Sequence, residues 1–332
     1  MRIGFAIGGL LSRARHGIVA GLVLGTAALT MPAQAQDAAN FPTRPVTLLV
    51  PWAPGGSSDL ASRLIANLLK KEMGWSVRIE NRPGAGSAVG LQMLANAKPD
   101  GYTFGLVTSS VVTNPILGDA TVNYSMFDPL RLTHISPGAI AVNSDSSLNS
   151  LNDLIEMAKK EPNRVRIGNT GTGATWHLLS MMIKDAADVE YVDVPYSSGS
   201  ELLAAVLGGH IEGAIQSIAG WQANVASGDL KVLGISSSER MTDNPDIATF
   251  KEQGADISYG LFVGFVAPKG VPEDIRTKLG DALSKTVQKD EFKAFAKENG
   301  MIIVDQGPAE FTKLLESEDA VTRDLAAKHF KK

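Results

Sequence analysis

The stretch VTLLVPWAPGGSSDLASRLIANLLKKEMGWSVRIE, residues 46–80, decides the fold class of this chain. It opens with five residues of mostly apolar, strand-forming character, and it closes with a second such run at Val77–Glu80. Between them leucine and isoleucine recur at helical spacing from Leu60 to Lys71, and Met73-Gly74 ends the expected helix. A strand, a helix and a strand in this order predict a parallel sheet covered by helices.

The same alternation continues along most of the chain. Further strands or extended segments are expected at Thr103–Val107, Leu132–Val142, Val165–Gly168, Val189–Val194, Ile211–Ile215, Lys231–Ser236 and Leu261–Ala267. Further helices are expected at Gly86–Ala97, Leu151–Lys160, Trp176–Ala186, Glu201–Leu207, Trp221–Ala226, Pro272–Gln288, Asp290–Asn299 and Pro308–Lys328. Asn123–Pro129 is expected to be irregular, and Ser144–Asn152 is a polar linker between two sets of elements. Two α/β units joined by extended segments predict two lobes with a cleft between them.

The N-terminal residues have the composition of a secretory signal peptide. Arginines at positions 2, 13 and 15 precede the apolar run Gly17–Thr30, and Ala33-Gln34-Ala35 follows it. The apolar run is shorter than the roughly 20 residues that span a bilayer, which disfavours the alternative of an uncleaved anchor helix. We therefore expect residues 1–35 to be a cleaved signal peptide, with cleavage after Ala35 and export to the periplasm.

Composition excludes several classes of function. The net charge is −4, and no run of Lys and Arg stands out, so a nucleic-acid partner is not expected. The chain has no cysteine, so disulfides, thiolate nucleophiles and Cys-ligated metals are excluded. The five histidines have no metal-ligand spacing, and we expect neither a metal nor a cofactor.

Three expected strand-to-helix junctions share one composition, glycines with Ser or Thr where the helix begins: APGGSSD (53–59), GNTGTGATWH (168–177) and PYSSGSE (195–201). In open α/β sheets, ligands bind at the carboxyl ends of strands, where these loops would lie. A helix start offers unpaired N–H groups and a partial positive charge, which suits an anion. The alternative is that the hydroxyl side chains only cap their own helices. Three such loops in both expected lobes favour binding.

Two rival functions find little support. No Lys completes a P-loop and no third Gly completes a dinucleotide fingerprint, which disfavours nucleotides. The hydrolase elbow G-x-S-x-G is absent, although a triad of Ser57 or Ser58 with His177 stays open from sequence alone. We expect His177 to brace its loop and Asp59 to stabilise its own helix, so no catalytic residue is assigned. The aromatic residues closest to the loops, which could shape a cleft or pack in the core, are Trp52, Trp176 and Tyr196.

Specific motifs connect the chain to a known family. PGGSSD at 54–59, ENRPGAG at 80–86 and KPDGYT at 98–103 occur in this order, and GTGATWHLL, VPYSSGSELLAAVLGGHIEGAI and GLFVGFVAPKGVPEDI follow. In these motifs, over roughly residues 41–315, the chain resembles Bug-family solute-binding proteins, the extracytoplasmic receptors of tripartite tricarboxylate transporters.

The resemblance implies an α/β fold of two lobes, type II-like, that closes on its ligand, with each lobe a mostly parallel sheet flanked by helices and a hinge of two crossing strands. It divides the chain into lobe 1, residues 36–141 plus 257–332, and lobe 2, residues 142–256. Family ligands are mostly carboxylates held by main-chain N–H groups and hydroxyls. The ligand-binding residues implied here are Gly55, Gly56, Ser57, Trp52, Ser109, Thr170, Gly173, Thr175, Trp176, Tyr196 and Gln216.

This sequence departs from the family pattern at several of these positions. The second loop has Ala174 where Ser is common, and the third has Ser197 and Ser198 where Lys often follows Pro-Tyr. Gln216 stands near a frequent Asp, and the identity of the acid therefore stays open.

The expected function is that of a non-catalytic, monomeric periplasmic receptor that delivers a di- or tricarboxylate or an aromatic acid to integral-membrane permease subunits. A receptor for a membrane sensor kinase and, less favoured, a hydrolase are the alternatives.

Overall fold

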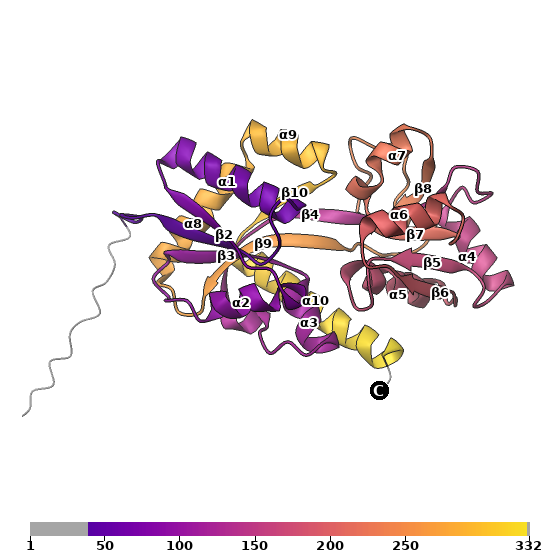
Figure 1. Cartoon of the computed structure of the whole chain (residues 1–332), viewed down its shortest axis with the longest axis horizontal. Coiled ribbons are helices and arrows are strands. Elements are labelled where there is room, and N and C mark those ends of the chain that lie inside the picture. The colour runs from indigo at the N-terminus through magenta and orange to yellow at the C-terminus, as the bar shows by residue number, and fades with distance from the viewer. Residues whose placement is uncertain (1–38, 331–332) are drawn as a thin grey trace, which may run out of the picture. The chain divides into compact units, whose positions relative to one another are not determined.

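A single long strand, β4 (Phe127–Asn143), is the central element of the fold. The structure is a computed structural model that describes residues 39–330, so the expected signal peptide lies outside the described residues. Figure 1 shows β4 running from one group of helices and strands into a second group. We call these groups the first and second lobes, and each is defined below by its elements.

The first lobe combines parallel strands from the N-terminal part of the chain with strands and helices from its C-terminal part. Its strands besides β4 are β1 (Val46–Val50), β2 (Val77–Asn81), β3 (Thr103–Thr108), β9 (Gly260–Pro268) and β10 (Ile302–Gln306). Its helices are α1 (Ser57–Met73), α2 (Ala88–Ala95), α3 (Ser110–Leu117), α8 (Glu273–Val287), α9 (Asp290–Glu298) and α10 (Pro308–His329), with short 3₁₀ turns η1 (Ala85–Ser87) and η2 (Tyr124–Met126).

The second lobe is formed by the middle of the chain. Its strands are β5 (Arg166–Asn169), β6 (Val192–Pro195), β7 (Gly213–Ser217) and β8 (Leu230–Ile235). Its helices are α4 (Leu151–Lys160), α5 (Thr175–Ala187), α6 (Gly199–Leu207) and α7 (Gln222–Ala226), with 3₁₀ turns η3 (Ile218–Gly220) and η4 (Lys251–Gln253).

Within residues 39–330 the strands form one mixed sheet in the order β2-β1-β3-β9-β4-β7-β5-β6, and β10 and β8 also pair with β4. The neighbours β1–β2, β1–β3, β5–β6 and β5–β7 are parallel, as the strand–helix alternation predicts. The pairs that involve β4 or β9 are antiparallel. Parallel strands β1, β2 and β3 end at one edge, where the loop APGGSSD begins, and the other two loops of interest follow β5 and β6.

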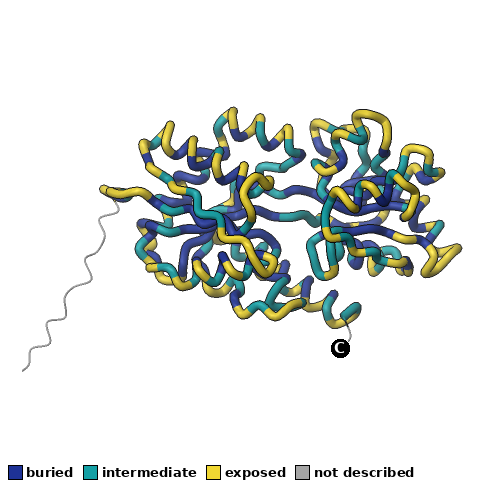
Figure 2. Tube along the Cα trace, viewed as in Figure 1, coloured by how far each residue is buried: buried dark blue, intermediate teal, exposed yellow. Residues whose placement is uncertain are grey.

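Both faces of each sheet region are covered by helices. Along β1, Val46, Leu48 and Val50 pack in one hydrophobic cluster and Leu49 packs in another, because successive side chains point to opposite faces. All four are buried, as expected for a strand in a sheet with helices on both sides. In the second lobe, Figure 2 shows buried residues along β5, β7 and β8, whereas the edge strand β6 is half-buried or exposed.

Two adjacent segments carry the chain between the lobes. On β4 the pairing partner changes from β9 at Pro137 to β7 at Gly138. On the returning segment, the Tyr259 N–H donates to Ser236 O of the second lobe at 2.9 Å, and Gly260 then starts β9. The crossing therefore occurs at Pro137–Gly138 and at Tyr259–Gly260.

Most expected elements coincide with observed ones, and α3 and β10 are additions that the periodicity did not predict. Helix α3 contains Pro115, which lacks an N–H and normally argues against a helix interior. Strand β4 begins at Phe127, inside the segment expected to be irregular. The polar residue there, Asp128, is buried but accepts a hydrogen bond from Gly270 N–H at 2.8 Å and pairs with Lys269 at 3.1 Å. No helix among the described residues is both long and apolar enough to cross a membrane.

A small cavity of about 230 Å³ lies beside the crossing segments, lined in part by Pro137, Tyr259 and Glu318. Glu318, on α10, is 6% exposed, and its Oε1 accepts a hydrogen bond from the Tyr259 hydroxyl at 2.7 Å. Burial raises the pKa of Glu318 from 4.5 to about 7. Between pH 4.5 and about pH 7, the folded protein therefore keeps a proton on Glu318 that the unfolded chain releases.

We predict that Glu318→Gln removes part of the pH dependence of stability. Because the pKa of Glu318 is raised on folding, its contribution is fully present below pH 4.5 and is lost as pH rises through about 7. The glutamine variant should therefore match the parent at acidic pH and exceed it at about pH 8 by about 1–3 kcal/mol in urea unfolding. Glu316→Gln, exposed on the same helix, is the control and should follow the parent. Parallel profiles for Glu318→Gln and the parent would contradict the prediction.

Candidate functional site

A cavity of about 730 Å³ lies where loops of both lobes meet. The β1–α1 and β5–α5 loops, with the first residues of their helices, contribute most of its walls. Residues of α3, β3, β9 and the turn η1 complete it. The lining residues are Trp52, Ala53, Pro54, Gly56, Ser57, Ser58, Gly86, Thr108, Ser110, Thr113, Asn114, Leu117, Gly118, Thr170, Thr172, Gly173, Ala174, Thr175, Trp176 and Leu261. The cavity thus lies at the carboxyl ends of β1, β3 and β5, the usual place for ligands in α/β sheets.

The β1–α1 loop is held from behind by Asp59. Its carboxylate is 1% exposed and accepts hydrogen bonds from Gly55 N–H at 2.9 Å, Arg63 Nε at 2.8 Å and Asn81 Nδ2 at 2.9 Å. Burial opposes ionisation of this carboxyl, but these hydrogen bonds outweigh it and hold the pKa of Asp59 at about 2. Asp59 therefore braces the loop as an anion, and the N–H of Gly55 is already used.

Helix α1 begins at the cavity without a side-chain cap. Gly56 is the N-cap residue, with extended backbone (φ −77°, ψ 167°), and among the described residues no side chain caps its first turn. Ser57 and Ser58 are the first two residues of the helix, so they do not occupy the capping position. Their N–H groups belong to the unpaired first turn of the helix and lie at the cavity wall.

The β5–α5 loop repeats this arrangement in the second lobe. Helix α5 starts after Ala174, and within the part of the chain that the structure describes it has neither a side-chain cap nor an acidic residue in its first turn. Gly173, at φ +75°, donates its N–H to His177 Nδ1 at 3.0 Å. Gly171 donates to Asn169 Oδ1 at 3.1 Å. The glycine turn is therefore fixed by side chains behind it, and Thr175 and Trp176 face the cavity.

His177 holds its loop, as expected. Its Nδ1 accepts the Gly173 hydrogen bond, and its Nε2 lies 3.9 Å from Asp193. Burial lowers the pKa of His177, which favours the neutral ring that can accept this bond. His177 is not among the described residues that line the cavity.

In the third glycine- and serine-rich loop, side chains accept hydrogen bonds from N–H groups at the start of the following helix. Ser198 Oγ accepts from Glu201 N–H at 3.2 Å and caps α6, and Glu201 Oε2 accepts from Ser197 N–H, just before the cap, at 3.2 Å. Tyr196, just before it, packs against the hydrophobic cluster of the second lobe. Here the capping interpretation holds, in contrast to the two loops at the cavity.

The residues implied for ligand binding fall into two groups. Those that line the cavity are Trp52, Gly56, Ser57, Thr170, Gly173, Thr175 and Trp176. Those outside its lining are Gly55, Ser109, Tyr196 and Gln216. Ser109 is completely buried, and the side chain of Gln216 lies against Gly199 and Gly220. Ligand contact by any of these residues stays a prediction.

Sequence reasoning missed the wall formed by α3. Ser110, Thr113, Asn114 and Leu117 recur at helical spacing, so one face of this helix lines the cavity. The spacing was the available signal, and Pro115 obscured it. From β9, Leu261 also faces the cavity, whereas its neighbours Gly260 and Phe262 line the small cavity beside the crossing segments, since alternate residues of a strand point to opposite sides.

The cavity is uncharged at its surface. Among the described residues that line it, none is Lys, Arg, His, Asp or Glu. No group of three or more potential His, Cys, Asp or Glu metal ligands occurs in residues 39–330. An anion in this cavity would therefore meet N–H groups, hydroxyls and two helix N-termini.

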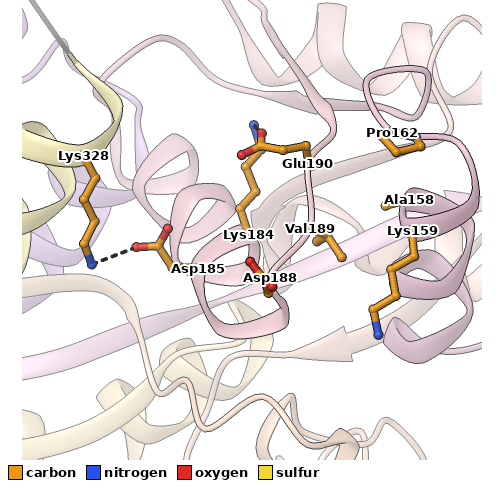
Figure 3. Close-up of a pocket in the computed structure, with 9 residues that line it drawn as sticks. All are labelled: Ala158, Lys159, Pro162, Lys184, Asp185, Asp188, Val189, Glu190 and Lys328. Carbon is orange, nitrogen blue, oxygen red and sulfur yellow. Dashed lines mark hydrogen bonds and ion pairs between the residues drawn. The ribbon is translucent and has the colours of Figure 1, made fainter.

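A second hollow, of about 550 Å³, lies on the second lobe and the end of α10 (Figure 3). The lysines that line it form ion pairs with acidic side chains. Lys184 Nζ lies 2.6 Å from Asp193, and Lys328 Nζ lies 3.2 Å from Asp185. Because these cations already have partners, the hollow is a weaker candidate for an anion than the cavity between the glycine loops.

The chain is similar to known proteins over most of its length. Residues 61–328 match the family model described as tripartite tricarboxylate transporter family receptor. A Cupriavidus necator protein, "UPF0065 protein in gbd 5'region", is 34% identical over 289 residues, which are 84% of this chain and 86% of that protein. Protein BugT of Bordetella pertussis is 28% identical over 292 residues, which are 86% and 89% of the two chains.

Solved structures show the same fold. A TctC solute-binding protein from Polaromonas, without ligand, superposes with a TM-score of 0.79 at 30% identity and covers 87% of this chain and 99% of its own. R. palustris Rpa4515, solved with adipate, has a TM-score of 0.74 at 26% identity, with coverage of 86% and 97%. The expected two-lobe binding-protein fold is thus confirmed. The chain belongs to the tripartite tricarboxylate transporter receptors, the Bug family of periplasmic solute-binding proteins.

Proposed function

We propose that this receptor captures a small organic carboxylate in the cavity between the glycine loops and delivers it to a membrane permease of the tripartite tricarboxylate type. One observation carries the proposal: α1 and α5, from different lobes, both begin without a side-chain cap at the same cavity. A carboxylate oxygen accepts the N–H groups that such helix starts leave unpaired.

Other helix starts show that the position of α1 and α5, and not the missing cap alone, supports this interpretation. Ser150 caps α4 by accepting from Asp153 N–H at 3.1 Å, and Ser198 caps α6. Among the described residues, α7 of the second lobe and α10 of the first also begin without a side-chain cap, but they start outside the cavity lining. What distinguishes α1 and α5 from these two is that their first turns meet at one cavity, where a ligand could accept their N–H groups.

The binding step requires both lobes. The resemblance places the lobe boundaries at 141/142 and 256/257, and we propose the crossing at Pro137–Gly138 and Tyr259–Gly260 as the hinge. The segment Gly138–Ala141, which pairs with β7, then belongs to lobe 2. A carboxylate held by Ser57 N–H of one lobe and Thr175 N–H of the other would interact more strongly when the lobes are closed. The permease would then recognise the closed form.

The known neighbours and the sequence support the same role. Rpa4515, which shares the fold, was solved with adipate, a carboxylate. His177 Nδ1 already accepts a hydrogen bond from Gly173 N–H, so it is not available as a general base. This is in keeping with a receptor that binds its ligand without a reaction. We further propose that residues 1–35 are removed on export and that the mature chain acts as a monomer in the periplasm.

A thermal-shift screen tests the function directly. The exported protein, purified from the periplasm, should unfold at a higher temperature in the presence of at least one organic acid from a panel of mono-, di-, tri- and aromatic carboxylates, because a ligand that binds the native state stabilises it. Absence of a shift with every acid would contradict the proposal.

Gly56→Val tests capture by the main chain. Gly56 has a backbone conformation that any residue adopts, and the nearest atom to an added Cβ would be Ala53 O at 3.9 Å. The variant should therefore fold, but its side chain would fill the approach to the N–H groups and weaken acid binding by about tenfold or more, measured by calorimetry.

Gly307→Val is the matched control. Gly307 is the N-cap residue of α10, with similar extended backbone (φ −74°, ψ −178°), and is not among the lining residues of the cavity. Binding should be unchanged in this variant. Equal affinities for Gly56→Val and Gly307→Val would exclude main-chain capture at Gly56.

Asp59→Asn tests the brace behind the first loop. Loss of the anion removes its attraction to Arg63 and weakens its bond to Gly55 N–H, so acid binding should weaken by about three- to tenfold. Since folding lowers the pKa of Asp59 from 3.8 to about 2, its contribution is present above pH 3.8 and lost as pH falls towards 2. The comparison therefore belongs at neutral pH.

Asp153→Asn is the control for the Asp59 variant. Asp153 also accepts a loop N–H, that of Asn149, at 2.8 Å in the first turn of a helix, but it lies outside the cavity lining. It should affect stability without changing acid affinity. If both variants bind as the parent does, the brace is not needed for binding.

A further inference from the structure

The hydrogen bond between Tyr259 and Glu318 joins the two lobes beside the crossing segments. The Tyr259 hydroxyl donates to Glu318 Oε1 of α10 at 2.7 Å, and Glu318 is buried. We infer that this bond is a tether, which holds the lobes in the arrangement that brings the two glycine loops to one cavity. The inference rests on the hinge proposed above and not on the identity of the acid.

The main chain of Tyr259 is fixed to the second lobe. Its N–H donates to Ser236 O at 2.9 Å, and its carbonyl oxygen accepts a hydrogen bond from Ser236 Oγ. Ser236 Oγ also accepts from Gly138 N–H at 2.8 Å, so this one buried serine holds both crossing segments. Tyr259 packs against a hydrophobic cluster of the second lobe that includes Trp176. When the second lobe rotates about the crossing, Tyr259 therefore moves with it.

Glu318 belongs to the first lobe. It follows Phe311 and Leu315 on one face of α10, and both of these side chains are buried in a cluster of the first lobe. The ring centroid of Phe311 lies 5.8 Å from that of Phe262 on β9. The carboxyl of Glu318 is thereby held on the first-lobe side of the crossing.

The last turns of α10 reach the second lobe at a second place. Leu325 packs against α5, and Lys328 and His329 form ion pairs with Asp185. These ion pairs are partly exposed to solvent, where such pairs contribute little. The bond of Glu318, in contrast, involves a buried carboxyl and lies at the crossing itself.

A second hydroxyl lies within reach of the same carboxyl. Burial raises the pKa of Glu318 to about 7, and the Tyr259 and Ser109 hydroxyls oppose this shift. Ser109 is completely buried between β3 and α3, and among the described residues its Oγ forms no hydrogen bond of good geometry. A rotation that draws Tyr259 away would leave the carboxyl this second partner, which avoids the cost of a buried polar group without one. Because the next residue, Ser110, lines the ligand cavity, the exchange would act on the cavity wall.

The tether favours the arrangement in which the loops meet. In that arrangement α3 approaches the second loop, since a Cβ added at Gly173 would lie 3.4 Å from Leu117 Cδ1. Tyr259 and Glu318 also line the cavity of about 230 Å³ beside the crossing, so the tyrosine ring has space into which it can move. Loss of the bond would therefore populate arrangements in which the loops lie further apart.

A distance measurement between the lobes tests the tether without a ligand. The chain has no cysteine, so Met93→Cys on α2 and Ala204→Cys on α6, both exposed, place one spin label on each lobe. In the exported and dialysed protein, Tyr259→Phe should add a population with a longer distance between the labels, because it removes the donor of the tether. A distribution identical to that of the parent would overturn the inference.

Tyr191→Phe is the matched control. Tyr191 is 3% exposed and its hydroxyl donates to Ser180 O at 2.8 Å, but both residues lie within the second lobe. The control should lower stability without changing the distance between the labels. Equal lengthening in both variants would also overturn the inference, since the loss of any buried hydroxyl would then loosen the lobes.

Variants of Glu318 separate the tether from packing. Glu318→Gln keeps an oxygen that can accept from the Tyr259 hydroxyl, so its distance distribution should match that of the parent. Glu318→Leu removes the acceptor, and its combination with Tyr259→Phe should lengthen the distance no further than either change alone, because both remove the same bond. Lengthening in the glutamine variant, or additive lengthening in the double variant, would contradict the tether. If Glu318→Leu does not fold, the Tyr259→Phe and Glu318→Gln variants decide.

Acid binding separates the tether from the proposed function. Tyr259→Phe should weaken binding of adipate, or of the panel acid with the largest thermal shift, by about three- to tenfold, because fewer molecules start in the competent arrangement. Unchanged affinity in a variant whose lobes have moved apart would overturn the role of the tether in binding. A longer distance together with no binding by any acid of the panel would overturn the proposed function and leave the tether in place.

Discussion

The hydrogen-bonded course of β4 is the constraint on which the rest of the structure depends. Its first part pairs with β9 and β10 and its last part with β7 and β8, so one strand is a structural member of both lobes. At the crossing, Gly138 leaves no room for a side chain, because an added Cβ would lie 2.3 Å from Leu179 Cδ2 and 3.0 Å from Trp176. The absence of a side chain lets α5 pack directly on the crossing strand. The same approach brings Trp176 to the cavity wall.

Residues at the cavity and residues behind its loops have different roles in the site. Gly56, Ser57, Gly173 and Thr175 lie at the cavity, and the charged or titratable side chains lie one layer behind. Asp59 and His177 each accept a hydrogen bond from a glycine N–H of their loop and so fix the turn that places the helix start. The cavity surface is thereby preorganised, and the described residues that line it include no ionised side chain.

Much of the fold could be predicted because local patterns match the tertiary arrangement. Strand β1 and helix α4 have the bounds that their periodicity indicated, and the glycine at 74 ends α1 in the left-handed conformation that favours glycine. Helix α3 was missed because Pro115 outweighed a short periodic pattern. The strand β10 is held by pairing with β4, a long-range interaction that leaves little local signal.

The site shows more clearly what the composition of a loop could not predict. All three glycine- and hydroxyl-rich loops looked alike in sequence, yet Ser198 and Glu201 close the third on itself, whereas α1 and α5 begin open. Whether a hydroxyl caps its own helix depends on where the N-cap position falls, and Gly56 and Ala174 occupy that position at the cavity. A shift of one residue thus separates a helix cap from a candidate ligand site.

The described residues that line the cavity include no titratable side chain, which has a consequence for the conditions under which such a receptor can work. Peptide N–H groups and hydroxyls do not change their charge as the surroundings become more acidic or alkaline. His177 stands behind the loop, and burial lowers its pKa and so favours its neutral form. Under the proposed function, the group whose charge changes with pH is the carboxyl of the ligand and not a described side chain of the cavity lining. The receptor would then keep its affinity across changes in the medium outside the cell for as long as the acid stays ionised.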